Sequence, residues 1–335
     1  MAEESCCGCV SLNVDNEYDM GLHVGAIFII FAVSGAGTIL PIISQKIPQC
    51  KTNSVIMEAI GAFAYGVVIA TGLIHMINEG IEKLSDPCLG SIVEEYESIG
   101  LAVVLITLML MHFIECESSV FFGAEGSMLH GGHGHGHAGP IDQETVATQH
   151  GVVTPGSAGS QYYEKTPDRP TNDLKIRRKL ATIIFEAGVI FHSVIIGLDL
   201  GVTTGPEFIT LLAALGFHQF FEGVAIGTSA LNSVESKSKL FLLNFMFAST
   251  TPLGQVIGIG IRNTYSASSS TSLWVQGTLD CVAGGILLYT GLVELLTYNM
   301  TTNGQFLSRP TSQRFALYIC LWLGASAMAL IGKWA

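Results

Sequence analysis

The chain has 335 residues, of which 49% are hydrophobic and only 13% are charged, and its formal net charge is −12. Soluble proteins carry about 25% charged residues, so this composition excludes an ordinary soluble protein. With 15 Lys and Arg residues the chain also lacks a basic surface for nucleic acid. We therefore expect a polytopic protein of the lipid bilayer that has no nucleic-acid partner.

Residues 1–21 are acidic and polar, and we expect them to form a tail outside the membrane. The tail contains Cys6, Cys7 and Cys9. These thiols could bind a soft metal, form disulfides with one another or with Cys88, or do neither. The sequence leaves these alternatives open.

Eight apolar stretches follow, each long enough to cross a hydrocarbon core, which takes about 20 residues of helix. Transmembrane β-strands would instead show alternating segments of about 10 residues. We therefore predict an all-α polytopic membrane protein, with three helices in residues 22–120 and five in residues 180–335. The eight predicted spans are 22–44, 55–78, 99–120, 180–204, 207–231, 239–261, 273–298 and 315–332.

Lys and Arg residues are distributed unequally between the two sides of these spans. Twelve of the 15 lie in connections that fall on one side, and the positive-inside rule assigns that side to the cytoplasm. Both termini then lie outside the cell or in a lumen, and we expect the plasma membrane as the location. The twelve are Lys46, Lys51, Lys165, Arg169, Lys175, Arg177, Arg178, Lys179, Lys237, Lys239, Arg309 and Arg314.

The third connection, residues 121–179, has low complexity, and we expect it to be a flexible cytoplasmic loop. Four of its imidazoles are separated by glycines, at His130, His133, His135 and His137. Repeated imidazoles on a mobile chain bind borderline metals such as Zn²⁺. The alternative is a spacer with incidental histidines, and we favour contact with metal for these four.

The most informative residues are titratable groups in the middle of the fourth and fifth spans, because a charge at membrane depth is costly. His192 lies in the middle of the fourth span and His218 in the middle of the fifth. Glu222 follows His218 by four residues, so these two side chains share one helix face about 6 Å apart. Two imidazoles and one carboxylate suit Zn²⁺ or Fe²⁺. We predict that these three residues bind the ion.

Neighbouring residues complete the predicted site. Asp199 follows His192 by seven residues, which returns to nearly the same face of a helix. Ser193 and Gln219 adjoin the two histidines in sequence. We expect Asp199, Ser193, Gln219 or water to fill the remaining ligand positions.

Two pairs of glycines lie beside these ligands, at Gly197 with Gly201 and at Gly223 with Gly227. Small residues spaced four apart let membrane helices approach closely. We therefore predict that these glycines bring the fourth and fifth helices close enough to share one ion.

Other polar residues within the spans are candidates for an ion pathway. His75 and Asp280 lie toward the predicted outer side, where they could form an entrance. Glu115 and Glu294 lie toward the predicted cytoplasmic side, where they either line an exit or form pairs at the interface. His112 is a further pathway candidate. For His75 and His112 taken singly, an interhelical hydrogen bond is the simpler interpretation.

Four segments carry a resemblance to a known family. They are Ala-Thr-Gly-Leu-Ile-His-Met at 70–76, His-Ser-Val-Ile-Ile-Gly at 192–197, His-Gln-Phe-Phe-Glu-Gly at 218–223 and Thr-Thr-Pro-Leu-Gly at 250–254. With these motifs and the His-rich third connection, the whole chain resembles the ZIP family of divalent-metal transporters (Zrt- and Irt-like proteins). The similarity is greatest to the fungal and plant branch of that family.

The resemblance implies a bundle of eight transmembrane helices in which helices 1–3 and 6–8 are related by pseudo-symmetry around helices 4 and 5. It also implies uptake of Zn²⁺ into the cytosol, with Zn²⁺ as substrate and no cofactor, and frequent homodimers. At the motif positions, His192, His218 and Glu222 would be the primary ligands, and Ser193 and Gln219 would adjoin them. Prokaryotic members with two adjacent ions have acidic residues where this chain has Ile196, Gln219 and Thr251, so a second adjacent ion is not expected.

The predicted function is import of Zn²⁺ by alternating access, and Fe²⁺ or Mn²⁺ are alternative substrates because the same ligands serve several metals. A membrane metal-sensing receptor, with the His-rich loop as its readout, is the alternative function. An intramembrane zinc protease would need a His-Glu-x-x-His motif. The sequence lacks this motif, so no enzymatic activity is expected.

Overall fold

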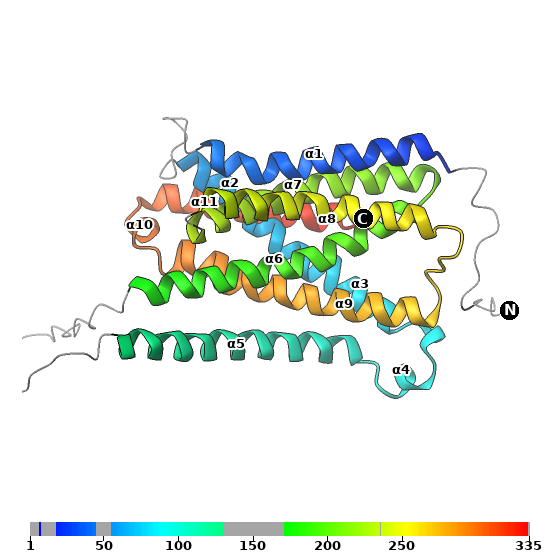
Figure 1. Ribbon diagram of the computed structural model, residues 1–335, viewed down its shortest axis with the longest axis horizontal. Helices are drawn as coiled ribbons and strands as arrows, with labels where there is room; N and C mark the ends of the chain where they lie inside the picture. Colours follow the sequence, from blue (N-terminus) through cyan, green and yellow to red (C-terminus); the bar gives the residue numbers. More distant parts are fainter. Residues whose placement is uncertain (1–6, 8–17, 45–54, 130–170, 235, 334–335) are drawn as a thin grey trace, which may run out of the picture.

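The computed structural model describes residue 7 and residues 18–44, 55–129, 171–234 and 236–333. In this described part of the chain, eight helices are long and apolar enough to cross a membrane. These helices lie alongside one another and are connected at the two ends of a bundle (Figure 1). The predicted all-α polytopic fold is confirmed.

The first span is α1, and the second is one continuous helix composed of α2, the π-helical segment η3 and α3. The next four spans are α5, α6, α7 and α8, the seventh is α9 continued by the π-helical segment η5, and the eighth is α11. Their bounds are α1 Met20–Ser44, α2 Val55–Ala70, η3 Thr71–Ile77, α3 Asn78–Leu84, α5 Ile99–Leu129, α6 Thr171–Val202, α7 Gly205–Ser233, α8 Lys237–Ile261, α9 Ser270–Tyr289, η5 Thr290–Thr301 and α11 Thr311–Ile331.

Short helices lie in the connections at opposite ends of the bundle. The 3-10 helix η4 (Pro87–Leu89) and α4 (Ser91–Glu95) lie at one end, and α10 (Gly304–Leu307) lies at the other (Figure 1). We call these the α4 end and the α10 end.

Each helix differs from its predicted span by a few residues, and three extend six residues or more beyond it. The second span, predicted over 55–78, continues to Leu84, so Lys83 lies on a helix rather than in a connection. Helices α5 and α6 continue into the segment predicted to be flexible, over residues 121–129 and 171–179. Hydropathy detects the apolar part of a helix, whereas backbone hydrogen bonds continue into polar sequence. This explains the longer helices.

Close backbone approaches join α6 to α8, α1 to α7 and α2 to α11. A Cβ atom added to Gly197 on α6 would lie 2.2 Å from the carbonyl oxygen of Thr251 on α8. One added to Gly227 on α7 would lie 2.5 Å from the carbonyl oxygen of Thr38 on α1. The prediction that the two glycine pairs bring the fourth and fifth helices together is therefore wrong, because each pair packs against a different helix.

The side chains between α6 and α7 explain this difference. The rings of His192 and His218 lie with their centroids 6.0 Å apart, so imidazoles rather than bare backbone fill the space between these two helices. Pairing of α1 with α7, and of α8 with α6, also agrees with the predicted pseudo-symmetry. That symmetry exchanges the first helix with the sixth and the fourth with the fifth.

Large apolar side chains cover the outward faces of α1, α5, α8 and α11. Phe28, Ile106, Phe241 and Trp322 are examples, each more than half exposed. In a bilayer such faces contact lipid tails, which are as apolar as the side chains themselves. The interior is packed around buried residues such as Phe185, Phe247 and Leu287. Polar groups inside this packing are therefore exceptional and call for an explanation.

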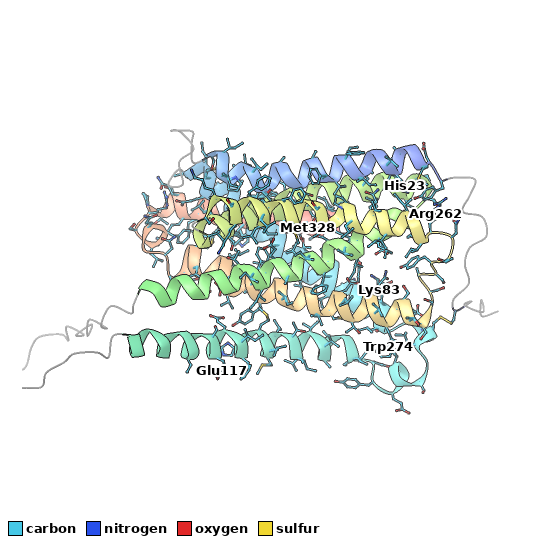
Figure 2. All side chains as sticks on the ribbon, in the orientation of Figure 1. His23, Lys83, Glu117, Arg262, Trp274 and Met328 are labelled. Atoms are coloured by element: carbon cyan, nitrogen blue, oxygen red, sulfur yellow. A yellow bond between two sulfur atoms is a disulfide. The ribbon has the colours of Figure 1, made fainter. Side chains whose placement is uncertain are left out.

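The described cations lie where the predicted alternation requires. Lys237 begins α8 and Arg309 follows α10, so both lie at the α10 end. There Arg309 forms an ion pair with Glu58. Lys83 and Arg262 lie toward the α4 end (Figure 2).

A disulfide joins Cys7 to Cys88 at the α4 end. It ties the chain before α1 to the short helix η4 and thereby selects one of the alternatives that the sequence left open for Cys7. Cys6 and Cys9 lie outside the described residues.

Candidate metal site

Three histidines from three different spans meet in the interior of the bundle. They are His75 on η3, His192 on α6 and His218 on α7, and their side chains are 3%, 1% and 0% exposed. One ring nitrogen from each lies within 4.8 Å of the other two. The ring centroids are 5.4 Å apart for His75 and His218 and 5.6 Å apart for His75 and His192. We refer to these three residues as the imidazole group.

The ring nitrogens of this group are short of hydrogen-bond partners. Both nitrogens of His192 and both of His218 have none among the described residues. A buried polar group without a partner is costly, and native structures rarely tolerate several together. Converging neutral imidazoles are also a preferred ligand set for Zn²⁺ and related transition metals. The chemistry of the group therefore fits a bound cation that supplies the missing partner.

A π-helical turn carries His75 to this position. The segment η3 spans Thr71–Ile77, and π turns are frequent at functional sites. A π turn shifts the register of the side chains that follow it. The Nδ1 atom of His75 lies 2.8 Å from Oε1 of Glu79. A carboxylate beside a ligating imidazole fixes its orientation and increases its basicity. The sequence placed His75 at an entrance, and the structure brings it into the imidazole group.

The other residues of the predicted primary site are buried around the group. Glu222 is 0% exposed, and neither of its carboxylate oxygens has a hydrogen-bond partner among the described residues. Ser193 is also buried, and its hydroxyl has no described partner. Gln219 donates a hydrogen bond from its amide to the hydroxyl of Thr251 on α8. Glu222 lies one helical turn from His218 toward the α10 end, outside the group of three converging nitrogens.

Asp199 lies in a different polar cluster, toward the α4 end. Its Oδ1 atom accepts a hydrogen bond of 3.4 Å from the amide of Gln276 and lies 3.5 Å from the hydroxyl of Tyr265. Gln276 also donates to the oxygen of Tyr265 at 2.7 Å. Burial, together with the Asp199 carboxylate, raises the pKa of Tyr265. This hydroxyl therefore stays protonated and can act as a donor.

Asp280, which was predicted to lie at an entrance, forms an ion pair with Lys83. The Nζ atom of Lys83 lies 2.7 Å from Oδ2 of Asp280 and 3.8 Å from Oε2 of Glu79. Because Glu79 also contacts His75, one chain of contacts runs from the imidazole group to Lys83 and Asp280. Sequence reasoning missed this role of Lys83, although the i, i+4 spacing of His75, Glu79 and Lys83 was a visible signal.

The remaining pathway candidates lie elsewhere in the fold. His112 is on an exposed face of α5, where its Nδ1 atom lies 3.3 Å from the hydroxyl of Tyr289 on α9. Tyr289 donates to the carboxylate of Glu115, so these residues form a contact between α5 and α9. Glu294 is partly buried on η5. His130, His133, His135 and His137 lie outside the described residues.

Comparison with known proteins assigns the chain to a family. The sequence model of the ZIP Zinc transporter family matches residues 20–332. This chain belongs to the ZIP zinc transporter family. It is therefore a multi-pass membrane transporter of divalent metal rather than an enzyme. Zn²⁺ is a transported substrate in this family and not a cofactor.

Individual relatives agree with this assignment. The chain is 34% identical to Zinc-regulated transporter 1 of Saccharomyces cerevisiae, over 96% of this chain and 89% of the relative. It is 31% identical to Fe(2+) transport protein 2 of rice, over 94% of this chain and 86% of the relative. It is 28% identical to Zinc-regulated transporter 1 of Candida albicans, where the match covers 96% of this chain but only 63% of the relative.

Proposed function

We propose that this ZIP protein imports Zn²⁺ into the cytosol and that His75, His192 and His218 hold the ion midway across the membrane, with Glu222 as the next ligand. The observation that carries the proposal is the convergence of three buried imidazoles from three spans. Ser193 and Gln219 adjoin this site. In this proposal Asp199 is not a direct ligand and belongs to the hydrogen-bond cluster on the α4 side of the site.

Two independent observations support the direction of transport. The sequence alternation assigns twelve of the 15 Lys and Arg residues to one side, and described members of that set such as Lys237 and Arg309 lie at the α10 end, which is the pattern of a cytoplasmic face. The disulfide between Cys7 and Cys88 lies at the opposite end, and disulfides persist in oxidising compartments such as the cell exterior or a lumen. The α4 end therefore faces outward, and the plasma membrane is the proposed location.

The topology has a simple test. Asn299-Met300-Thr301 is the chain's N-glycosylation motif and lies near the α10 end. We expect Asn299 to remain without glycan when the protein is expressed in a eukaryotic cell. Glycan on Asn299 would place the α10 end in a lumen or outside the cell and would reverse the proposed direction.

The substrate is tested by flux of ⁶⁵Zn into liposomes that contain the purified protein. We expect His192→Ala and His218→Ala each to reduce uptake to the level of empty liposomes, because each removes one of three converging ligands. His112→Ala, which removes an exposed imidazole from α5, is the matched control and retains uptake. Competition with unlabelled Fe²⁺ and Mn²⁺ then measures selectivity, since one relative is named for Fe²⁺.

Two further proposals do not rest on contacts between described residues. A homodimer is proposed on the family resemblance, and the mass of the protein in lipid nanodiscs tests it. The metal-sensing alternative rests on residues 130–137, which are outside the described residues. Transport is therefore the function that the site geometry supports best.

A further inference from the structure

Glu186 is a buried carboxylate that the proposed imidazole site does not use. It lies on α6 on the α10 side of His192, its side chain is 5% exposed, and its Oε1 atom has no hydrogen-bond partner among the described residues. An ionisable group at membrane depth without a partner is costly and points to a functional role. Its position relative to Glu222 indicates what that role is.

Contacts between α6 and α7 fix the relative heights of these two carboxylates. The two helices run antiparallel, with Thr182 and Ser229 joined by a hydrogen bond of 2.9 Å and with the rings of His192 and His218 6.0 Å apart. At about 1.5 Å per residue, a residue six positions before His192 lies about 9 Å from it along the axis, and one four positions after His218 lies about 6 Å away. Glu186 and Glu222 occupy these positions, so they differ in height by only about 3 Å.

The contact between Thr182 and Ser229 shows which helix faces carry the two carboxylates. Glu186 follows Thr182 by four residues and shares its face of α6. Glu222 precedes Ser229 by seven residues and shares its face of α7. Because Thr182 contacts Ser229, both of these faces border the contact between α6 and α7. The face of Glu186 also carries Gly197, which packs against α8, so the two carboxylates lie beside the junction of these three helices at nearly the same depth.

A third buried oxygen lies about one helical turn from this level. Asn244 on α8 is 6% exposed, and its Oδ1 atom has no described hydrogen-bond partner. It precedes Thr251 by seven residues, so it shares the face of α8 that Thr251 presents to Gly197 of α6 and to Gln219 of α7. The parallel course of α6 and α8 then places Asn244 about one turn from the level of Glu186.

We propose that Glu186, Glu222 and Asn244 form a second cation site, built from oxygen ligands, between the imidazole group and the α10 end. Neither carboxylate forms an ion pair with a described residue, and a divalent cation bound between the helices would supply the missing counter-charge. Imidazole suits Zn²⁺ and Fe²⁺, whereas carboxylate and amide oxygens suit harder ions such as Mn²⁺. This site extends the proposed function. It rests on that function in one respect, namely that the ion passes from the imidazoles to weaker ligands before it is released.

Binding of Mn²⁺ tests the site without reference to transport. The full-length protein is purified into nanodiscs and titrated with Mn²⁺ while electron paramagnetic resonance measures the free ion. We expect Glu186→Gln to weaken binding at one site by about tenfold, the scale of one lost contact to a charged group. Glu117→Gln removes the same charge from an exposed position on α5 (Figure 2) and is expected to leave that binding unchanged.

A double variant separates this site from the imidazole group. His75→Ala with His192→Ala removes two imidazoles but none of the three oxygen ligands, so the Mn²⁺ site affected by Glu186→Gln should persist. Equal Mn²⁺ binding by the wild-type protein and Glu186→Gln would overturn the proposal. So would loss of that binding in the double imidazole variant, because the ion would then belong to the imidazole group.

Transport by the same variants gives the second readout. For Glu186→Gln we expect the maximal rate of ⁶⁵Zn uptake to fall about tenfold, while the half-saturating Zn²⁺ concentration changes less than about twofold, because the imidazoles that first hold the ion are intact. Glu186→Asp keeps a carboxylate and should recover part of the rate. Lost uptake with unchanged Mn²⁺ binding would give Glu186 a structural role and overturn the site. If His192→Ala retains uptake, the proposed function fails while the Mn²⁺ titration still decides the oxygen site.

Discussion

The polar groups on the two sides of the imidazole group differ in whether they have partners. Toward the α4 end, Lys83 lies 2.7 Å from Asp280 and 3.8 Å from Glu79, so the carboxylates there have a cation within the protein. Toward the α10 end, Glu222 and Glu186 have carboxylate oxygens without hydrogen-bond partners among the described residues. Lys83 therefore neutralises carboxylates on the α4 side, whereas Glu186 and Glu222 on the α10 side form no ion pair with a described residue.

This difference affects how strongly a cation is attracted on each side of the imidazole group. An ion that enters from the α4 end meets the positive charge of Lys83 first, whereas an ion beyond the imidazoles meets unpaired carboxylates. Opposite charges within a low-dielectric interior attract strongly. A cation is therefore attracted more strongly on the α10 side of the imidazoles than on the α4 side, whereas the direction of net transport depends on the electrochemical gradient of the ion.

The largest expected effect comes from breaking the ion pair on the α4 side. Asp280→Ala leaves the Lys83 ammonium without its nearest partner, so we expect the free energy of unfolding to fall by about 3 kcal/mol, as when one member of a buried pair is removed. Thermal unfolding in detergent without added metal measures this change. Glu186→Gln, which removes an unpaired carboxylate on the α10 side, should leave stability unchanged or higher. Equal losses in both variants would show that the two sides do not differ.

A smaller effect is expected from the hydrogen-bond cluster around Asp199. Tyr265→Phe removes the hydroxyl that Gln276 and Ser272 contact at 2.7 Å and 3.3 Å, and we expect a loss of about 1 kcal/mol, the net value of a typical hydrogen bond. The same thermal unfolding assay applies. Tyr96→Phe changes a tyrosine that is 54% exposed and serves as the control. No difference between the two variants would mean that these hydrogen bonds do not stabilise the protein.

The smallest expected effect tests whether the charge of Lys83 affects the entry of the ion. Lys83→Met removes a positive charge while keeping a long side chain, so Glu79 and Asp280 should attract cations more strongly. We expect the half-saturating concentration for ⁶⁵Zn uptake to fall about threefold, which corresponds to about 0.65 kcal/mol. Lys239→Met removes an exposed charge at the α10 end and should not change this value. A rise in the half-saturating concentration for Lys83→Met would contradict the charge argument.

Much of the fold and part of the site could be predicted from the sequence. Hydropathy located all eight spans because each needs about 20 apolar residues to cross the bilayer. His192, His218 and Glu222 stood out because titratable groups are rare at membrane depth. The i, i+4 spacing of His218 and Glu222 also placed their side chains on one face of α7.

The other features depend on contacts that a single sequence does not encode. His75 joins the imidazole group because η3 is π-helical, and no residue pattern marks that change of register. The glycine pairs on α6 and α7 were correctly read as sites of close packing, but their partners are α8 and α1. The pairing of Lys83 with Asp280 joins residues that are 197 positions apart, so it emerges only from tertiary packing.

The central claim is that the transported ion is held by three imidazoles, and His75 tests it most directly because it belongs to the group by geometry. The measurement is ⁶⁵Zn uptake into liposomes by His75→Ala, with His112→Ala as the matched control. We predict that His75→Ala reduces uptake to the level of empty liposomes while His112→Ala transports like the wild-type protein. Wild-type uptake by His75→Ala would show that the ion does not need the third imidazole and would contradict the account.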